Sequence, residues 1–263
     1  IQENLEPLGA RFEPDPIRFV TPDWLPTREN REYEAAVQRL EDVVADVIAE
    51  RRGTEGSDDD DDPPMDLLSI LLRAQNRNEQ TDEQLRDEVV TMLLAGHDTT
   101  ALTLTYAFYL LSEHPEVERQ VHAELDDILD GAPTFADTRE LTYLDRVLQE
   151  TMRLYPPVYV MFREPEVDAK LGDYRVPAGA AIMLPQWAVH RSSRWWTEPE
   201  QFDPDRWTRE RRGGRPRFAH FPFGGGPRHC IGKHFSLLEA KLILAAVGQE
   251  YSLEYARDEP RDL

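Results

Sequence analysis

The sequence predicts a mainly α-helical domain that carries a small β-sheet. Apolar residues recur at helical spacing between residues 28 and 154, and the capping box Thr81-Asp82-Glu83-Gln84 precedes the longest periodic segment. Between residues 158 and 190 the pattern changes to short extended pieces separated by proline and glycine turns. The 263 residues are enough for a large core, in one domain or two.

Helices are expected along the first part of the chain and again at its end. Their expected residues are 28–52, 65–74, 81–112, 115–131 and 138–154, with a closing helix that extends to residue 250. Residues 101–111 are apolar on nearly all sides, so this part of the longest helix is expected to be buried. The aspartate run at 58–62, followed by two prolines, is expected to be a solvated loop.

The composition is strongly acidic. The formal net charge is -21, and only three of the 30 basic residues are lysines. An acidic surface keeps a protein in solution at high salt, so we expect a halophilic archaeal source. An acidic protein that binds a cationic partner is the alternative. The charge argues against nucleic acid as a partner.

The single cysteine, Cys230, excludes an internal disulfide. Nothing in the sequence therefore indicates an oxidising compartment, and a cytoplasmic location is expected. No segment reaches the roughly 18 apolar residues of a membrane helix, and the first residues have no signal-peptide pattern. The chain opens with Ile1, so an upstream anchor or signal remains open.

Cys230 lies near the end of a glycine-rich loop that runs into an apolar helix. The loop reads Phe223-Gly224-Gly225-Gly226-Pro227-Arg228-His229-Cys230-Ile231-Gly232. Glycines allow the backbone to approach a flat cofactor, Arg228 offers a cation, and a helix N-terminus stabilises a thiolate. This combination suits a thiolate bond to haem iron. A buried structural cysteine beside an ordinary glycine turn is the alternative.

A run of poor helix formers, Ala95-Gly96-His97-Asp98-Thr99-Thr100, interrupts the longest periodic segment. A conflict between low helix propensity and a position inside an expected helix is typical of functional sites. Gly96 would let a ligand approach, Asp98 and Thr99 supply an acid and a hydroxyl, and an opened helix hydrogen bond would leave a groove. The alternative is a bent helix whose threonines bond back to preceding carbonyls, with Asp98 exposed.

Glu150 and Arg153 are three residues apart and share one face of an expected helix. That face lies opposite Leu144 and Leu148. Periodicity alone therefore predicts an exposed ion pair of little energetic value.

The cysteine loop resembles the haem-binding signature of the cytochrome P450 family, which reads aromatic, Gly, any, Gly, any, Arg, any, Cys, any, Gly. Every specified position matches. The resemblance implies that Cys230 is the axial thiolate ligand of haem b, that Phe223 packs beside it, and that Arg228 contacts a haem propionate. The specified glycines belong to the same cofactor site; they are Gly224, Gly226 and Gly232.

The resemblance also implies roles on the longest helix. There Asp98 and Thr99 match the acid and alcohol that relay protons to dioxygen in the family. Ala95 and Gly96 would line the pocket over the haem.

Three charged residues resemble the family's structural charge triad, which positions the loop before the cysteine. They are Glu150, Arg153 and Arg206. The segment around Arg206 departs from the family pattern at Asp205 and Trp207. Arg163 and His190 match positions that reach a haem propionate, and an ordinary polar residue at a strand end is the alternative for each.

The resemblance implies a haem-thiolate mono-oxygenase that inserts one atom of O2 into a small apolar substrate, with electrons from a ferredoxin-type partner. A peroxide-using or rearranging enzyme, and a haem-binding sensor or inactive fragment, remain open. An arginine-rich segment is expected to dock the acidic donor, unless neighbouring carboxylates neutralise it. Its docking residues are Arg211, Arg212, Arg215 and Arg217.

The match runs from about residue 24 to residue 250 in the family's order. The family has further helices upstream and a hairpin downstream. We therefore expect a partial single domain, 1–263, that is the C-terminal haem-binding part of the fold and incomplete at both ends. Its expected parts are a helix and acidic loop (1–64), core helices (65–157), and the sheet, cysteine loop and closing helix (158–263). Catalysis is ascribed to the longer parent enzyme.

Overall fold

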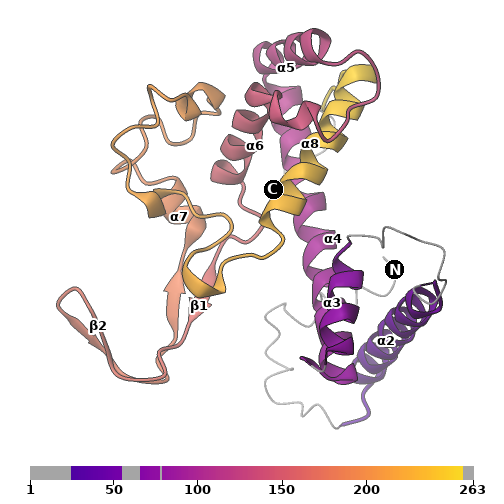
Figure 1. The fold of residues 1–263 in the computed structure, drawn as a ribbon. Coiled ribbons are helices and arrows are strands. Elements are labelled where there is room, and N and C mark those ends of the chain that lie inside the picture. Colours follow the sequence, from indigo (N-terminus) through magenta and orange to yellow (C-terminus); the bar gives the residue numbers. More distant parts are fainter. Residues whose placement is uncertain (1–24, 55–65, 78, 257–263) are drawn as a thin grey trace. The chain divides into compact units, whose positions relative to one another are not determined.

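The computed structural model describes residues 25–54, 66–77 and 79–256 (Figure 1). The chain divides into two compact units, Ile1–Ala95 and Gly96–Leu263. The division falls inside one helix, and the parts 1–64, 65–157 and 158–263 that the sequence suggested stay a prediction. The aspartate run at 58–62 lies outside the described residues.

Unit 1 contains helix α2 (Arg28–Thr54), helix α3 (Leu67–Asn76) and the first part of helix α4 (Asp82–Glu113). The predicted capping box is confirmed at the start of α4. The Gln84 amide donates to Thr81 Oγ1 at 3.2 Å, and the Thr81 amide donates to Gln84 Oε1 at 2.9 Å. A buried cluster in the core of this unit is aliphatic: Val44, Ile48, Leu72 and Leu85.

Unit 2 is built around helices α5 (Pro115–Ile128), α6 (Thr142–Leu154) and α8 (Lys233–Glu250), which lie together in Figure 1. Their shared core is apolar and includes Val121, Leu125, Leu144, Val147, Leu148 and Leu244. The mainly α fold with small antiparallel sheets that the sequence predicted is confirmed.

The helix expected at 138–154 begins only at Thr142. A separate 3-10 turn, η2 (Asp137–Arg139), precedes it. The reason is a cap from α5, since the Glu124 carboxylate accepts hydrogen bonds from the amides of Tyr143 at 2.6 Å and Leu144 at 2.9 Å. A carboxylate at this position satisfies free amides and complements the helix dipole.

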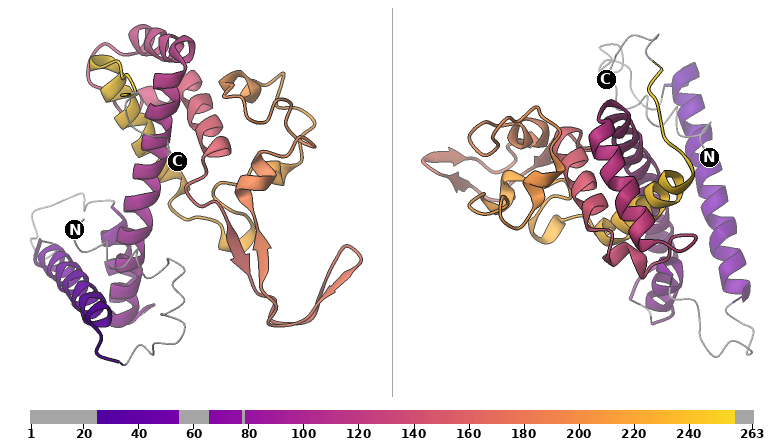
Figure 2. Two further views of the ribbon diagram at one scale, coloured as in Figure 1. Left: turned by 180° about the vertical axis from the view of Figure 1, so that it is seen from behind. Right: turned by 90° about the horizontal axis from the view of Figure 1, so that it is seen from above.

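The predicted small sheet is two separate antiparallel pairs. Strand β1 (Met161–Arg163) pairs with β4 (Ile182–Leu184), and β2 (Ala169–Leu171) pairs with β3 (Tyr174–Val176). Figure 2 shows the β2–β3 hairpin extending as a narrow arm from the rest of unit 2.

Short elements then lead from the sheet to the cysteine loop. In chain order they are α7 (Gln186–His190), η3 (Pro204–Trp207), η4 (Arg217–Ala219) and η5 (Gly226–Arg228). Contacts of α7 and η3 with α6 bring this irregular segment onto the helical core.

The expectation that residues 101–111 are buried on nearly all sides is wrong for part of this stretch. Ala107 and Leu110 are buried, but Leu102 is 39% exposed and Thr105 is also exposed. A helix that packs on one side leaves the side chains of its other face accessible. The buried side joins the unit 2 core, where Tyr106 stacks on Tyr155 with ring centroids 4.9 Å apart.

Candidate functional site: the cysteine loop and its support

The cysteine loop folds back on itself through backbone hydrogen bonds. The Gly224 amide donates to the Phe221 carbonyl at 2.8 Å, and the Cys230 amide donates to the Phe223 carbonyl at 2.9 Å. Gly224 and Gly226 have φ angles of 71° and 74°, in the left-handed region that favours glycine. The backbone path that presents Cys230 therefore requires both glycines.

Cys230 carries a free, exposed thiol. Gly232 is the N-cap of α8, which begins at Lys233, so the positive end of the helix dipole lies close to Cys230 in the chain. A Cβ added at Gly232 would lie 3.9 Å from the Cys230 sulfur, so glycine keeps the space beside the sulfur open. An accessible sulfur near a helix N-terminus and a lysine is suited to act as a thiolate ligand.

The residues around Cys230 fit a haem group. The thiol is a soft ligand of the kind that binds haem iron. A Cβ added at Gly226 would meet nothing within 4 Å, so there is open space at the turn of the loop. Ile231 and Phe235 are 80% and 69% exposed and supply apolar surface, and Arg228 is an exposed cation. These properties match a flat, apolar cofactor with acidic groups at its edge.

The three predicted propionate partners lie in different environments. Arg228 is exposed in η5, and Arg163 is half-buried at the end of β1, where its Nη1 donates to the Phe162 carbonyl at 2.8 Å. His190 is fully buried, and its Nε2 accepts a hydrogen bond from the Phe221 amide at 2.9 Å. The expected contact of His190 with a haem propionate stays a prediction, because its Nε2 is used by Phe221 while its Nδ1 has no hydrogen-bond partner among the described residues.

The three residues of the predicted charge triad meet in one buried network. Arg153 donates from Nε and Nη2 to the two carboxylate oxygens of Glu150, each at 2.8 Å, and Arg206 Nε donates to Glu150 Oε1 at 2.9 Å. Glu150 and Arg153 are 0% exposed and Arg206 is 4% exposed. The exposed pair that periodicity predicted is wrong, because η3 covers the face of α6 opposite Leu144.

Two further donors complete the surroundings of the Glu150 carboxylate. The Asp203 amide donates to Oε1 at 3.1 Å, and the Trp207 indole Nε1 donates to Oε2 at 2.9 Å. Sequence reasoning treated Trp207 only as a conservative departure from the family pattern. An indole N–H needs an acceptor when it is buried, and this requirement was the signal that could have identified its role.

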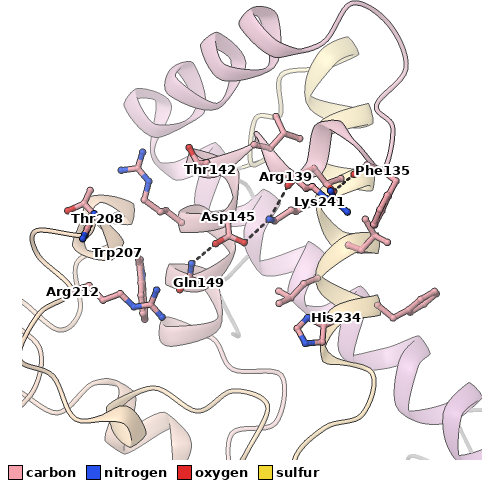
Figure 3. A pocket seen from close by; sticks show the side chains of 17 residues that line it. Phe135, Arg139, Thr142, Asp145, Gln149, Trp207, Thr208, Arg212, His234 and Lys241 are labelled. Atoms are coloured by element: carbon pink, nitrogen blue, oxygen red, sulfur yellow. Dashed lines mark hydrogen bonds and ion pairs between the residues drawn. The ribbon is translucent and has the colours of Figure 1, made fainter.

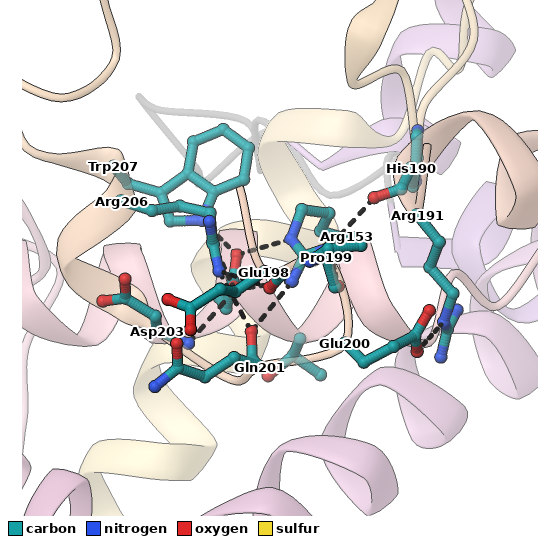
Figure 4. Close-up of polar contacts among 12 residues, drawn as sticks. Arg153, His190, Arg191, Glu198, Pro199, Glu200, Gln201, Asp203, Arg206 and Trp207 are labelled. Atoms are coloured by element: carbon teal, nitrogen blue, oxygen red, sulfur yellow. Dashed lines mark hydrogen bonds and ion pairs between the residues drawn. The ribbon is translucent and has the colours of Figure 1, made fainter. Parts of the chain in front are cut away.

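The two guanidinium groups also hold the backbone between residues 197 and 201 (Figure 4). Arg153 donates to the Pro199 carbonyl at 2.6 Å, and Arg206 donates to the carbonyls of Thr197 at 2.7 Å and Glu198 at 3.2 Å. Glu198 has a φ angle of 46°, which is uncommon for a residue other than glycine. The network therefore holds this segment in a conformation that costs energy locally.

The polar run on α4 is part of a continuous helix. Residues 95–100 are helical throughout, so the interruption expected there is absent from this structure. Asp98 is exposed, Thr99 is half-buried, and Gly96 has open space where a Cβ would lie. Ala95 is exposed and belongs to unit 1. Thr103 Oγ1, one turn beyond the run, bonds back to the Thr99 carbonyl at 2.9 Å, whereas Thr100 Oγ1 has no hydrogen-bond partner among the described residues.

The four arginines expected to dock a donor do not have equal access to solvent. Arg211 pairs with Asp203 at 2.6 Å. Arg215 is half-buried, donates to the Arg206 carbonyl at 2.6 Å and lies over the Trp196 ring at 4.4 Å; burial lowers its pKa. Arg212 and Arg217 are exposed. Two of the four side chains are therefore already used within the protein.

A cavity of about 930 Å³ lies between η2, α6, η3 and α8 (Figure 3). Its charged lining residues are mostly cationic: Arg139, Asp145, Arg146, Arg209, Arg212 and Lys241. Asp145 is paired with Lys241 at 2.8 Å. The sequence did not predict this cavity, because its walls come from segments up to about a hundred residues apart. Cys230 is not among its lining residues.

None of the helices in the described parts of the chain combines the length and the apolar character needed to span a membrane.

Comparison with known proteins identifies one family. The sequence model described as Cytochrome P450 matches residues 4–263. The chain is 42% identical over 233 residues to "Cyclooctat-9-en-7-ol 5-monooxygenase" of Streptomyces melanosporofaciens, which covers 87% of this chain and 50% of that protein. It is 37% identical over 237 residues to "Pentalenene oxygenase" of Streptomyces avermitilis, which covers 89% of this chain and 51% of the relative.

A mammalian relative gives a similar alignment. The chain is 34% identical over 248 residues to human "Cytochrome P450 4V2", which covers 88% of this chain and 47% of that protein. The chain therefore spans about half the length of the curated relatives it matches.

Proposed function

Since this chain belongs to the cytochrome P450 family, we propose that it forms the haem-binding part of a mono-oxygenase that inserts one atom of O2 into an apolar organic substrate. The observation that carries the proposal is the exposed Cys230 thiol, presented by a glycine loop beside the N-terminus of α8. The relatives named for cyclooctat-9-en-7-ol and pentalenene support an apolar substrate.

Cys230 would hold haem b through its sulfur, with Phe223 beside it and Arg228 as the cation for a propionate. When bound, the haem supplies the electron-transfer chemistry that activates dioxygen. Gly224, Gly226 and Gly232 keep side chains out of the loop, so the cofactor can approach the backbone. Arg163 is proposed as a second propionate partner.

Asp98 and Thr99 are proposed as the acid and the alcohol that deliver protons during the reaction. Asp98 is exposed and can exchange its carboxyl proton with water, while Thr99 is half-buried next to it. A hydroxyl both accepts and donates, so the Thr99 Oγ1 can pass a proton inward from the Asp98 carboxyl. Gly96 and Ala95 leave room for substrate along the same helix.

Glu150, Arg153 and Arg206 are proposed to position the cysteine loop without taking part in the chemistry. Their bidentate and charge-assisted bonds satisfy the buried charges on α6 and η3. A fixed segment at 197–201 limits how far the chain leading to the loop can move.

The test of the proposal is the spectrum and turnover of the full-length protein. The reduced, carbon-monoxide-bound form should have the red-shifted band of thiolate ligation, and Cys230→Ser should abolish it. Product should require both O2 and an electron donor. Product from peroxide alone would instead favour a peroxide-using enzyme, and haem binding without turnover would favour a sensor or an inactive protein.

The electron donor is proposed to be an acidic ferredoxin-type protein. Of the four arginines expected to dock it, Arg212 and Arg217 have the exposed charge that steering requires. Charge reversal at both should slow reduction several-fold at low salt, and Arg119→Glu on α5 is the matched surface control. Unchanged reduction in the double variant would remove the docking proposal.

The acidic composition supports a further proposal, that the protein works in a salt-rich cytoplasm such as that of a halophilic archaeon. The relatives named above come from Streptomyces and human, so composition alone supports it. Molar potassium chloride should then raise the free energy of unfolding, because salt screens repulsion among the carboxylates. A free energy that falls as salt rises would contradict the proposal.

A further inference from the structure

His190 lies between the buried ion network and the cysteine loop. It ends α7, is 0% exposed, and uses two of its polar atoms on different partners. Its carbonyl accepts a hydrogen bond from Arg153 Nη1 at 2.9 Å, and its ring Nε2 accepts one from the Phe221 amide at 2.9 Å. One residue therefore connects Arg153 to the backbone that leads into the loop.

From Phe221 the hydrogen bonds continue to the cysteine. The Phe221 carbonyl accepts from the Gly224 amide at 2.8 Å, and the Phe223 carbonyl accepts from the Cys230 amide at 2.9 Å. A path of hydrogen bonds, joined by short backbone segments, therefore leads from the His190 ring to Cys230. Displacement of Phe221 would be passed to the residues that shape the loop.

The contact requires a neutral imidazole. A ring nitrogen accepts a hydrogen bond only when it carries no proton. Burial lowers the pKa of His190 to about 4; the backbone of Met152 opposes this shift, and the nearby charges of Arg153 and Arg191 add to it. The His220 ring, whose centroid lies 4.9 Å away, also has a lowered pKa because it is buried, and it adds no cation at neutral pH.

Packing fixes the orientation of the ring as well. The Phe221 ring meets His190 edge to face, with centroids 5.2 Å apart and planes at 85°. The ring is therefore held from one side by Phe221 and from another by His220. The acceptor nitrogen has little freedom to leave the Phe221 amide.

We infer that His190 is a positioning residue whose ring nitrogen fixes the start of the cysteine loop to the buried Glu150–Arg153 pair. The inference deepens the proposed function, on which its relevance to haem binding rests. Its physical basis is the half-buried Phe221 amide, which has the His190 ring nitrogen as its acceptor. Loss of that acceptor leaves an unsatisfied N–H and loosens the loop.

The matched variants are His190→Gln and His190→Asn. Glutamine places its amide oxygen near the position of Nε2 and keeps an acceptor for Phe221, whereas the shorter asparagine falls short of it. His190→Phe keeps the ring and removes the acceptor. His220→Phe is the control in the same aromatic cluster, because His220 Nε2 has no hydrogen-bond partner in the structure.

Hydrogen exchange of the Phe221 amide, in the full-length haem-loaded protein, is the primary measurement. We expect exchange about tenfold faster in His190→Phe and His190→Asn, and close to the wild-type rate in His190→Gln and His220→Phe. The fraction of protein with the thiolate band should fall in the first two variants and recover in His190→Gln.

Equal exchange rates in wild type and His190→Asn would overturn the inference. So would equal acceleration by His220→Phe, which would indicate general loosening of the cluster. If His190→Phe does not fold, the difference in Phe221 amide exchange between His190→Asn and His190→Gln still tests the inference. Because amide exchange does not depend on iron ligation, failure of the Cys230→Ser test would leave this result interpretable.

Discussion

The buried ion network and the cysteine loop differ in how their residues are held. Glu150 accepts five hydrogen bonds from four residues inside the protein, and of these partners Arg153, Arg206 and Trp207 are at most 7% exposed. The cysteine loop is exposed from Gly226 to Ile231 and keeps its shape through backbone bonds and two left-handed glycines. The rigid part of the structure is therefore the buried network around Glu150, whereas the Cys230 sulfur stays accessible.

Among the tests of this comparison, Glu150→Gln is expected to have the largest effect on stability. The variant keeps the side-chain shape but leaves Arg153 and Arg206 buried without their carboxylate, so we expect a loss of about 3–5 kcal/mol in the free energy of unfolding. Urea unfolding of the full-length protein measures it. The control is Glu200→Gln, which removes a 72% exposed partner of Arg191 and should cost at most about 1 kcal/mol. Equal effects would mean that burial does not distinguish the two pairs.

Acid should weaken the connection at His190. The folded-state pKa of about 4 lies below the ordinary value of 6.5, so the unfolded chain binds the proton first. The stability from the neutral ring is present above pH 6.5 and is lost as the pH falls toward 4. At pH 5 the loss is roughly 2 kcal/mol relative to pH 7.5.

The check is to compare urea unfolding of wild type and His190→Gln at both pH values. Glutamine does not titrate, so the variant should lose less stability by roughly that amount. Parallel losses in the two proteins would assign the acid effect to other groups.

A smaller effect is expected in the loop itself. Gly226→Ala has space for its Cβ, so its cost is the strain of a φ angle of 74°, about 1 kcal/mol. Gly213→Ala is the control, because that glycine also has open space but no left-handed φ angle. Differential scanning calorimetry of both variants should give a lower Tm for Gly226→Ala only.

The smallest effect should come from Arg211→Ala. Its ion pair with Asp203 joins side chains that are 51% and 20% exposed, at the edge of the buried network. We expect a change within about 0.5 kcal/mol in urea unfolding, and a smaller one at high salt. A loss comparable to that of Glu150→Gln would place Arg211 inside the network.

Local signals were sufficient to predict the starts of two helices, but not the short helix α7, which lies where extended structure was expected. The capping box at Thr81 and the proline at 115 fixed the starts of α4 and α5, because both act on amides within one turn. The start of α6 could not be found this way, since its cap is the Glu124 carboxylate from another helix. Burial of Glu150 depends on Arg206 and Trp207, more than fifty residues away.

The loop was predictable in part. Its glycines were assigned to close approach of a cofactor, and the structure adds that two of them are needed for backbone conformation. The contact between His190 and Phe221 has no sequence signal, because 31 residues separate the partners and neither lies in a periodic segment. The half-buried position of Arg215 was hidden for the same reason, since the Trp196 and Trp207 rings that cover it come from other turns of the chain.

The indole of Trp207 gives the network an intrinsic optical reporter. Its indole N–H donates to Glu150, and the residue is 7% exposed. The centroids of the Trp207 and Trp196 rings are 5.5 Å apart. Opening of this region would expose the fluorophore to water and shift its emission to longer wavelength. Because the chain has five tryptophans, the difference in emission between wild type and Trp207→Phe follows the scaffold with no added dye.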